Sequence, residues 1–570
     1  MALTRLTVAS PSEEGGERLS DEVELYQRTY TTLLRSSGET RLRVLEPSHR
    51  AMGSSLHPLA ASDELDLGAF LYSIRRLPDG IVGAALIVMG QDVQVFEAAG
   101  IDVESWDEAE APARRRRWYE GPDDALAVLL ASASDVDDLV PTLVAFQIEW
   151  NKIRQRMRAA GWPVEGMTPE ACAAELGGGA DDWGRLKEAW GDRFDETMAL
   201  VAGDRLSLRV RMLGGTHIGY ARLTRRWWQP VREQLQLEEL ADKPLYFISS
   251  NTHSIVNIAT GVARDREDEL VRFVEQLPES DILRAELDSF RAGESEGSWE
   301  NFLYFVARDY WDARGEGGRA ERAAAERASG VTHLRSKTAL RVPAQIMSPA
   351  EWNPEKLDPR LGAIDADALA RSQAAVVNVD YPLGLAAYNI LREIAVDSAA
   401  LRGVYVLGKA ATLNADVGDV MLSTVVHDEH SNSTYWLDNA FSIDDIAGDL
   451  RFGTGLDNQR AVTVKSTFLQ NRAYLDFYYR EAFTVVEMEA GPFCNAVYEI
   501  ADPDRHPVGE AVNFSKLPVD FGIIHYASDT PYTQARTLGA RGLSYYGMDS
   551  TYASSLAILR RILRLEGALS

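Results

Sequence analysis

The feature that most limits the fold of this chain is a change of pattern after Arg341. From there to the C-terminus, short apolar runs alternate with stretches that have the apolar spacing of helices. Strand-like and helical segments that interleave in this way predict helices packed against a mixed sheet, an α/β sandwich. The expected strands are residues 374–379, 403–407, 419–426, 461–465, 483–486 and 521–526, and the expected helices are residues 383–394, 492–500 and 552–565.

The first part of the chain has a different character. Residues 21–327 contain segments with helical apolar spacing, among them residues 135–159, 181–202 and 265–277. A chain of 570 residues is too long for one ordinary core. We therefore expect a large, mainly α-helical domain of unknown role over residues 1–335 and an α/β domain over residues 336–570.

Composition limits the partners and the compartment. The formal net charge of −27 argues against a nucleic acid or an anionic membrane as a partner. The N-terminal residues lack the apolar core of a signal peptide, and the most apolar run, residues 81–90, is too short to span a bilayer. The two cysteines, Cys172 and Cys494, fall in different expected domains, so we expect neither a disulfide framework nor a thiolate metal site. These features fit the reducing cytoplasm.

Two of the expected strands end in carboxylates. One apolar run leads into Glu487-Met488-Glu489, and another leads into Ser528-Asp529, with Asp529 forty residues after Glu489. Two parallel strands that end in this way place both acids at one edge of a sheet, where ligands bind in open α/β folds. One acid can then hold sugar hydroxyls while the other gives a proton to a leaving group.

Five motifs, taken in order, resemble those of the nucleoside phosphorylase superfamily, which includes purine nucleoside phosphorylases, methylthioadenosine nucleosidases and AMP nucleosidases. They are residues 377–385, a glycine segment over residues 406–420, residues 467–469, Glu487-Met488-Glu489-Ala490, and Ser528-Asp529. The resemblance covers residues 340–570 only, and residues 528–531, Ser-Asp-Thr-Pro, are most similar to the AMP nucleosidase branch. It implies a three-layer αβα fold around a mixed sheet and assembly into homo-oligomers.

The resemblance also implies roles for the matching residues. Asp529 is expected to be the general acid at the purine, with Ser528 beside the base. Glu489 is expected to bind the ribose hydroxyls, with Met488 against the sugar face and Glu487 in the same motif. Met488 is also compatible with a plain core position.

The implied reaction is cleavage of the N-glycosidic bond of a purine nucleoside or nucleotide, without a cofactor. Phe468 is expected to form an apolar wall for the base. A plain core aromatic is an equally good interpretation of Phe468.

The match is incomplete where phosphate would bind. Phosphorylases of this superfamily usually carry a Gly-Ser-x-Gly loop, whereas here Gly408 is followed by Lys-Ala-Ala-Thr. Water is therefore the expected nucleophile; phosphate is the alternative, and a nucleotide-binding regulatory module without turnover is another. Gly408, Lys409 and Thr412 can instead contact an anion, although Lys409 is equally compatible with a solvated loop. Arg536 and Arg541 follow the acid motif where the superfamily places a cation, and either is also compatible with a surface position.

Three further motifs have two interpretations each. In His427-Asp428-Glu429-His430 neighbouring side chains of an extended segment point to opposite faces, so a pocket-lining loop or a solvated turn is favoured over a metal site. Residues 249–254, Ser-Ser-Asn-Thr-His-Ser, are interpreted as a helix cap beside a buried histidine, with a second ligand site as the alternative. The four arginines at residues 114–117 are interpreted as a solvated helix face, with a nucleotide-phosphate contact as the alternative.

Overall fold

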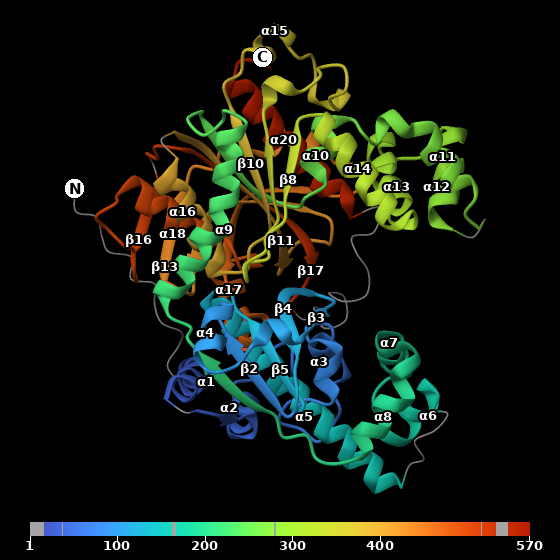
Figure 1. Ribbon diagram of the computed structural model, residues 1–570. Helices are drawn as coiled ribbons and strands as arrows, with labels where there is room; N and C mark the ends of the chain where they lie inside the picture. Colours follow the sequence, from blue (N-terminus) through green and yellow to red (C-terminus); the bar gives the residue numbers. More distant parts are fainter. Residues whose placement is uncertain are drawn as a thin grey trace. The chain divides into compact units, whose positions relative to one another are not determined.

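The computed structural model describes residues 16–36, 38–161, 167–278, 281–398, 400–514, 516–531, 545 and 547–569 (Figure 1). This part of the chain forms two compact units. The first unit comprises the described residues up to Leu223, the segment Val464–Phe483 and Pro531. The second comprises Thr224–Thr463, Thr484–Thr530 and the described residues from Tyr545 on.

The content and the boundary of the first unit differ from the prediction. This unit, expected to be mainly helical, contains a sheet of six strands as well as helices, and the second unit begins at Thr224 and not near residue 336. The reason lies in β7 (Leu245–Ser250), a strand buried along its whole length that pairs in parallel with β10 (Ala375–Asp380) and β11 (Leu401–Thr412). A short apolar run is equally compatible with a buried strand or part of a helix, and its partners lie far along the chain. The sequence pattern therefore did not reveal it.

The sheet of the first unit is mixed. Its strand order is β1-β6-β2-β5-β4-β3, with β2 parallel to β5 and β6, and with β1, β3 and β4 antiparallel to their neighbours. Its strands are β1 (Thr40–Arg41), β2 (Leu86–Gly90), β3 (Asp107–Ala111), β4 (Arg114–Glu120), β5 (Ala125–Leu129) and β6 (Arg209–Leu213). Its helices are α1 (Gly16–Ser36), α2 (Glu46–Ala51), α3 (Leu67–Ile74), α4 (Val93–Ala98), α5 (Ala133–Ala160), α6 (Pro169–Leu176), α7 (Ala180–Trp190) and α8 (Phe194–Ala202), joined by η10 (Thr467–Leu469) and α17 (Arg472–Arg480) from the inserted segment.

The four consecutive arginines at residues 114–117 lie in β4, so the prediction of a solvated helix face is wrong. Alternate side chains of a strand point to opposite faces. Arg114 and Arg116 both face α5, where they bind the carboxylates of Asp135 and Asp138. Paired buried arginines in a strand look like a charge run in the sequence, because their partners lie on another element.

The sheet of the second unit contains a closed circuit of strands. The order β12-β14-β15-β11-β17 returns to β12, because β17 pairs with both β11 and β12. The remaining strands extend from this circuit, with β7, β10, β9 and β8 beyond β11 and with β13 and β16 beyond β12. The strands not yet given are β8 (Val331–Leu334), β9 (Ala344–Met347), β12 (Val420–Asp428), β13 (Ser433–Leu437), β14 (Gly455–Thr463), β15 (Val485–Glu487), β16 (Ala511–Phe514) and β17 (Asp520–Asp529).

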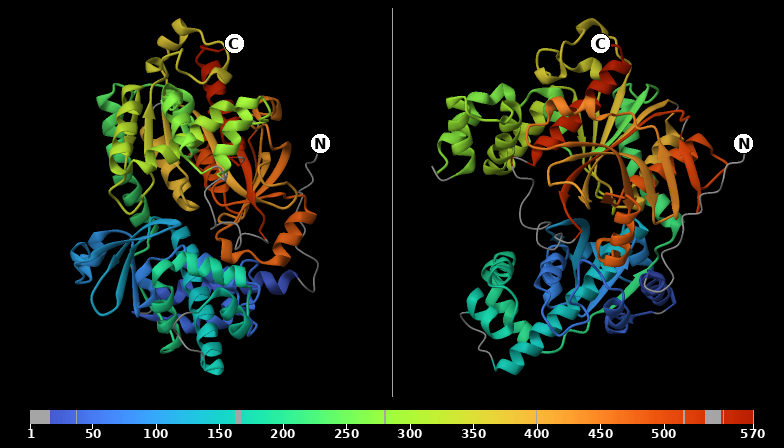
Figure 2. Two further views of the ribbon diagram at one scale, coloured as in Figure 1. Left: turned by 90° about the vertical axis from the view of Figure 1, so that its right-hand side faces the viewer. Right: turned by 180° about the vertical axis from the view of Figure 1, so that it is seen from behind.

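Helices cover both faces of this sheet (Figure 2). Along β7, Tyr246 and Ile248 belong to the same core as residues of α20, whereas the ring of Phe247 lies 5.7 Å from that of Phe493 on α18. This alternation confirms the prediction of a mixed α/β unit. The helices are α9 (His217–Leu237, which begins in the first unit), α10 (Ser254–Thr260), α11 (Glu267–Glu275), α12 (Ile282–Ala292), α13 (Trp299–Ala313), α14 (Gly315–Ala328), α15 (Ala366–Ala370), α16 (Leu385–Asp397), α18 (Ala490–Ala501) and α20 (Met548–Leu565). Among the described residues, no helix combines the length and the apolar character needed to cross a bilayer.

Candidate functional site

Glu487, the last residue of β15, organises the turn that follows it. Its side chain is buried, and its Oε2 accepts hydrogen bonds from the backbone N–H groups of Glu489 (2.6 Å) and Ala490 (2.7 Å). The Thr463 hydroxyl donates to Oε1 of the same carboxyl group, and Thr463 Oγ1 accepts from the N–H of Gly491 (2.7 Å). Glu487 therefore fixes the backbone that carries Glu489 into the first turn of α18.

A buried histidine lies beside this carboxyl group. His525 Nε2 is 3.9 Å from Glu487 Oε2, and His525 Nδ1 is 3.4 Å from Ser423 Oγ. Burial raises the pKa of Glu487 to about 7, against the opposing effect of the two backbone N–H groups, and burial lowers the pKa of His525 to about 3. The histidine is thus neutral at neutral pH, and the glutamate is close to half-protonated there.

Asp529 lies at the end of β17 and is 2 % exposed. Ala411 of β11 pairs with Val486 of β15 on one side and with Asp529 on the other. The acid motifs of both strands therefore flank the same stretch of β11, one strand away on each side. An irregularity in the register after Ala410 brings Asp529 opposite Ala411.

The expectation that the two acid-bearing strands are parallel is wrong. β17 runs parallel to β11, whereas β15 runs antiparallel to it. β11 lies in register between the two acid-bearing strands, so the acid motifs flank it on its two sides and do not end at one edge as parallel strands would. Strand direction depends on pairing across the sheet, which the apolar runs do not encode.

The other residues of the two acid motifs are less buried than Glu487 and Asp529. The Ser528 hydroxyl donates to the backbone oxygen of Ala410 at 3.3 Å, which fixes the bulged residue of β17. Met488 and Glu489 are half-buried, and Glu489 stands immediately before α18. Glu489 is therefore the more accessible of the two glutamates.

Phe468 lies in the first unit, apart from the acid motifs in the division of the chain. Its ring is 1 % exposed and lies 5.3 Å from the ring of Tyr72, 6.0 Å from that of His49 and 6.3 Å from that of His57. The side chain is thus a core aromatic of the first unit. We leave it out of the site considered below.

The segment expected to hold phosphate is not a loop. Gly408 and Lys409 lie inside β11, and the strand continues to Thr412. The Thr412 hydroxyl accepts hydrogen bonds from the N–H groups of Asn414 (3.3 Å) and Ala415 (2.8 Å), so it closes a turn of its own chain. Lys409 is exposed. Arg536 and Arg541, the other two residues of the expected anion site, lie outside the described residues.

Sequence reasoning singled out the polar residues at the end of β7 but did not place them with the acid motifs. β7, β10, β11 and β17 form one parallel set, so the carboxyl ends of these strands share an edge. Asn251 follows β7 there, and its Oδ1 accepts from the N–H groups of His253 (2.9 Å) and Ser254 (2.7 Å). These bonds confirm the interpretation of residues 249–254 as a helix cap. The cap also places Asn251 at the edge where Asp529 ends β17.

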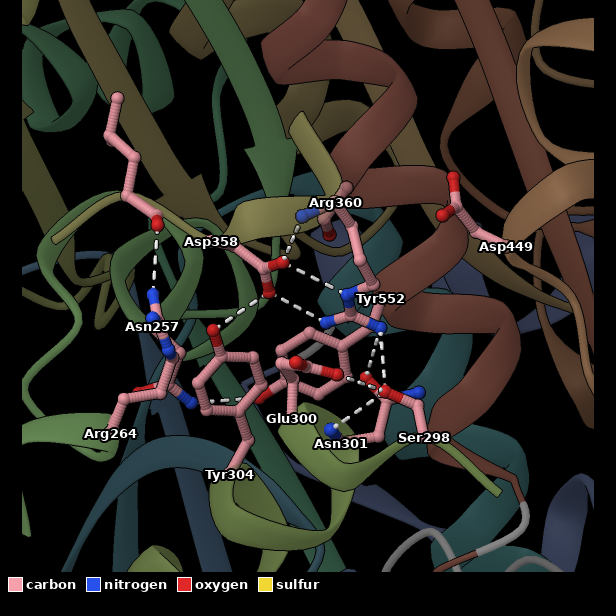
Figure 3. Close-up of polar contacts among 12 residues, drawn as sticks. Asn257, Arg264, Ser298, Glu300, Asn301, Tyr304, Asp358, Arg360, Asp449 and Tyr552 are labelled. Carbon is pink, nitrogen blue, oxygen red and sulfur yellow. Dashed lines mark hydrogen bonds and ion pairs between the residues drawn. The ribbon is translucent and has the colours of Figure 1, made fainter. Parts of the chain in front are cut away.

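A buried polar network connects three helices of the second unit. The Tyr304 hydroxyl donates to Asp358 at 2.8 Å, and Arg360 binds the same carboxylate through Nε (2.9 Å) and Nη2 (2.7 Å) (Figure 3). The ring of Tyr304 stacks on that of Tyr552 at 4.9 Å, and Asn257 donates to the Tyr552 hydroxyl at 2.7 Å. These groups satisfy one another, so the network supports α10, α13 and α20.

The histidine-rich motif at residues 427–430 comprises the last two residues of β12 and the first two of the turn that follows. Asp428 is buried and accepts hydrogen bonds from the N–H groups of His430 (3.1 Å) and Ser431 (3.1 Å) and from the side-chain amide of Asn495 (2.7 Å). His427 Nδ1 lies 2.9 Å from the Thr434 hydroxyl on the neighbouring strand. Within the described ranges, no group of three or more metal-ligating side chains is placed to hold an ion.

The fold and the acid motifs together define a mixed α/β protein whose second unit brings two carboxylate-bearing strands to one central strand. The chain belongs to the family of unknown function DUF6909, whose model matches residues 42–564. A search of curated proteins finds no match.

Several solved structures have a limited likeness to the chain. A putative methylthioadenosine nucleosidase from Weissella paramesenteroides is 11% identical, with a TM-score of 0.26, over 40% of this chain and 88% of its own. A 5'-methylthioadenosine/S-adenosylhomocysteine nucleosidase from Colwellia psychrerythraea, in complex with adenine, is 14% identical, with a TM-score of 0.27, over 43% of this chain and 88% of its own. Uridine phosphorylase from Schistosoma mansoni, in complex with uracil, is 10% identical, with a TM-score of 0.30, over 58% of this chain and 90% of its own. At these TM-scores the likeness assigns neither a fold nor an activity.

Proposed function

We propose that the second unit cleaves the N-glycosidic bond of a purine nucleoside or nucleotide, with water as the nucleophile. The observation that carries the proposal is the double pairing of Ala411, which has Val486 on one side and Asp529 on the other. This register places the run Glu487-Met488-Glu489 and Asp529 around one strand. The ordered motifs of the sequence support the same reading of these residues.

Asp529 is the proposed general acid. Cleavage of the bond leaves negative charge on the departing base, and a carboxyl group that protonates the base lowers the barrier. The side chain of Asp529 is 2 % exposed, and a buried carboxyl group is the environment that such an acid requires.

Glu489 is the proposed ligand of the sugar hydroxyls. Hydrogen bonds from ring hydroxyls to a carboxylate strengthen as the sugar gains oxocarbenium character. Glu487 has a positioning role, because its buried carboxyl group holds the backbone N–H of Glu489 at 2.6 Å. A shift of this backbone would move the Glu489 carboxylate relative to the sugar.

Water is favoured over phosphate by the structure of β11. The glycine segment forms a strand, and the hydroxyl of Thr412 is occupied by two N–H groups of its own turn. A phosphate loop needs several free backbone N–H groups that point at the anion. Residues 408–412 do not offer this arrangement.

The test is a base-release assay with AMP, adenosine, inosine and methylthioadenosine, each with and without phosphate, followed by chromatography. We expect free base without phosphate from at least one substrate. Asp529→Asn should lower this rate by about 10²–10⁴-fold, the usual contribution of a general acid. Asp504→Asn, at an exposed aspartate of the same unit, should leave the rate unchanged.

Three outcomes would change the proposal. Base release that requires phosphate would make the enzyme a phosphorylase. Tight binding of one of these compounds without release would make the unit a nucleotide-binding regulatory module. Release at the wild-type rate by Asp529→Asn would remove Asp529 from the mechanism.

A further inference from the structure

Three arginines and two aspartates form a cluster in the first unit, in which all the side chains except that of Arg114 are buried. Arg114 on β4 makes two hydrogen bonds with Asp138 on α5, through Nε and Nη2, both at 2.9 Å. Arg116, two residues further along β4, binds Asp135 at 2.8 Å and Asp138 at 2.7 Å. These two arginines therefore use both carboxylates of the cluster. Arg76 is the third arginine.

Arg76 has no counter-charge of its own. It follows α3 by two residues, and its side chain is 4 % exposed. Its Nη1 donates to the backbone oxygen of Tyr72 at 3.0 Å, and its Nε has no hydrogen-bond partner among the described residues. No carboxylate in the described part of the chain lies within 4.0 Å of its nitrogens. Three guanidinium groups thus face two carboxylates, which leaves one positive charge in excess.

The hydroxyl of Tyr72 is a second unsatisfied group at the same place. The Arg76 guanidinium lies over the Tyr72 ring, with Cζ 3.3 Å from the ring centroid. The buried Tyr72 hydroxyl has no hydrogen-bond partner among the described residues. Tyr72 and Arg114 each affect the pKa of Arg76, and Tyr72 also affects that of Arg114, so the three side chains are neighbours.

Physical chemistry disfavours leaving such groups unpaired. A buried charge without a partner and a buried hydroxyl without a hydrogen bond have both lost the hydration that they had in the unfolded chain, and nothing replaces it. Burial and the neighbouring Arg114 lower the pKa of Arg76 to about 10, so the guanidinium is still charged at neutral pH. One bound anion supplies the missing charge and accepts hydrogen bonds from both unsatisfied donors.

We propose that Tyr72, Arg76 and Arg114, here called the Arg76 site, bind a small oxyanion: a phosphate group, free or as the monoester of a metabolite, or a carboxylate. The planar guanidinium fork matches the oxygens of phosphate and carboxylate better than it matches chloride. The site lies within the first unit, and it stands independently of the glycosidase activity proposed for the second.

The test measures anion binding to the full-length protein by isothermal titration calorimetry and by thermal unfolding at constant ionic strength. The probes are inorganic phosphate, AMP, adenosine, acetate and chloride. We expect saturable binding of phosphate, AMP or acetate, a Tm that rises with its concentration, and no such effect of chloride. Binding of AMP but not adenosine identifies a monoester, binding of free phosphate alone identifies the inorganic ion, and binding of acetate alone identifies a carboxylate.

Arg76→Gln is the decisive variant. It should weaken oxyanion binding at least tenfold, while its Tm without anion stays at or above that of the wild type, because the variant removes an unpaired buried charge. Arg117→Gln is the matched control: Arg117 lies on β4, the strand of Arg114 and Arg116, and pairs with the exposed Glu108, so this variant should bind as the wild type does.

Tyr72→Phe keeps the variant test valid if Arg76→Gln does not fold. It removes one hydroxyl and should weaken oxyanion binding severalfold. No saturable binding of any oxyanion to the wild type would overturn the proposal, as would wild-type affinity in Arg76→Gln. With Tyr72→Phe as the only folded variant, wild-type affinity in that protein would overturn it as well.

Discussion

The fold opposes the ionisation of Glu487, a single residue on which the acid motif depends. Burial raises its pKa from an ordinary value of 4.5 to about 7. Between these values the unfolded chain has released its proton while the folded protein still holds it. Stability therefore falls as the pH rises through this window and levels off above it.

Glu487→Gln should remove this dependence, because the amide does not ionise. The wild type should lose about 3 kcal/mol relative to the variant between pH 4.5 and pH 7.5. Urea unfolding at a series of pH values measures this difference. Glu355→Gln, at an exposed glutamate of the same unit, should show no such trend. A constant difference between the wild type and Glu487→Gln would mean that the carboxyl group ionises freely in the folded protein.

At the scale of single residues, the sequence identified the two acids but not the strand pairing that relates them. The carboxylates of Glu487 and Asp529 stand out because each ends an apolar run. That both motifs flank one stretch of β11 depends on the pairing of Ala411, a small residue without any chemical signature. Likewise, Asn251 looks like an ordinary helix cap, and only the parallel pairing of β7 with β11 places it at the edge of the sheet.

At the scale of elements, strands and helices with local apolar patterns could be predicted. The strand expected at residues 521–526 is β17, and the helix expected at residues 135–159 is α5. The helix expected at residues 181–202 is divided into α7 and α8, where Gly191 has a φ of +54° that favours glycine. β7 and β4 were missed for two different reasons: the apolar run of β7 is short, and β4 carries arginines whose partners lie on α5.

The network around Asp358 ties three elements together, and its loss should be costly. Asp358→Asn keeps the shape of the side chain but leaves Arg360 without a full counter-charge in a buried site. Breaking one partner of such a pair typically costs 3–5 kcal/mol. We expect a fall in the urea midpoint of the second unit that corresponds to this range.

Asp265→Asn is the matched control, because Asp265 and Lys356 form an ion pair at an exposed position. Surface pairs contribute about 0–1 kcal/mol. Similar midpoints for Asp358→Asn and Asp265→Asn would show that the network of Figure 3 does not support the helices.

At the scale of the whole molecule, neither of the two units is one continuous segment of the chain. The segment Val464–Phe483 lies between β14 and β15, two neighbouring strands of the second unit, yet it belongs to the first. A sequence pattern assigns such a segment to the domain that surrounds it. Phe468 was expected near the acid motifs for this reason. A substitution of Phe468 therefore tests the division of the chain into two units.

Phe468→Ala should destabilise the first unit and spare the second. The ring packs against Tyr72 and the two histidines of the first unit, and removing a buried phenylalanine typically costs 3–5 kcal/mol. Hydrogen exchange followed by mass spectrometry should show faster exchange in α3 and α5 and unchanged exchange in β11 and β17. Tyr479→Ala, at an exposed residue of the same segment, should change neither set. Faster exchange in β11 and β17 with unchanged α3 and α5 would place the ring of Phe468 in the second unit and restore it as a candidate wall for the base.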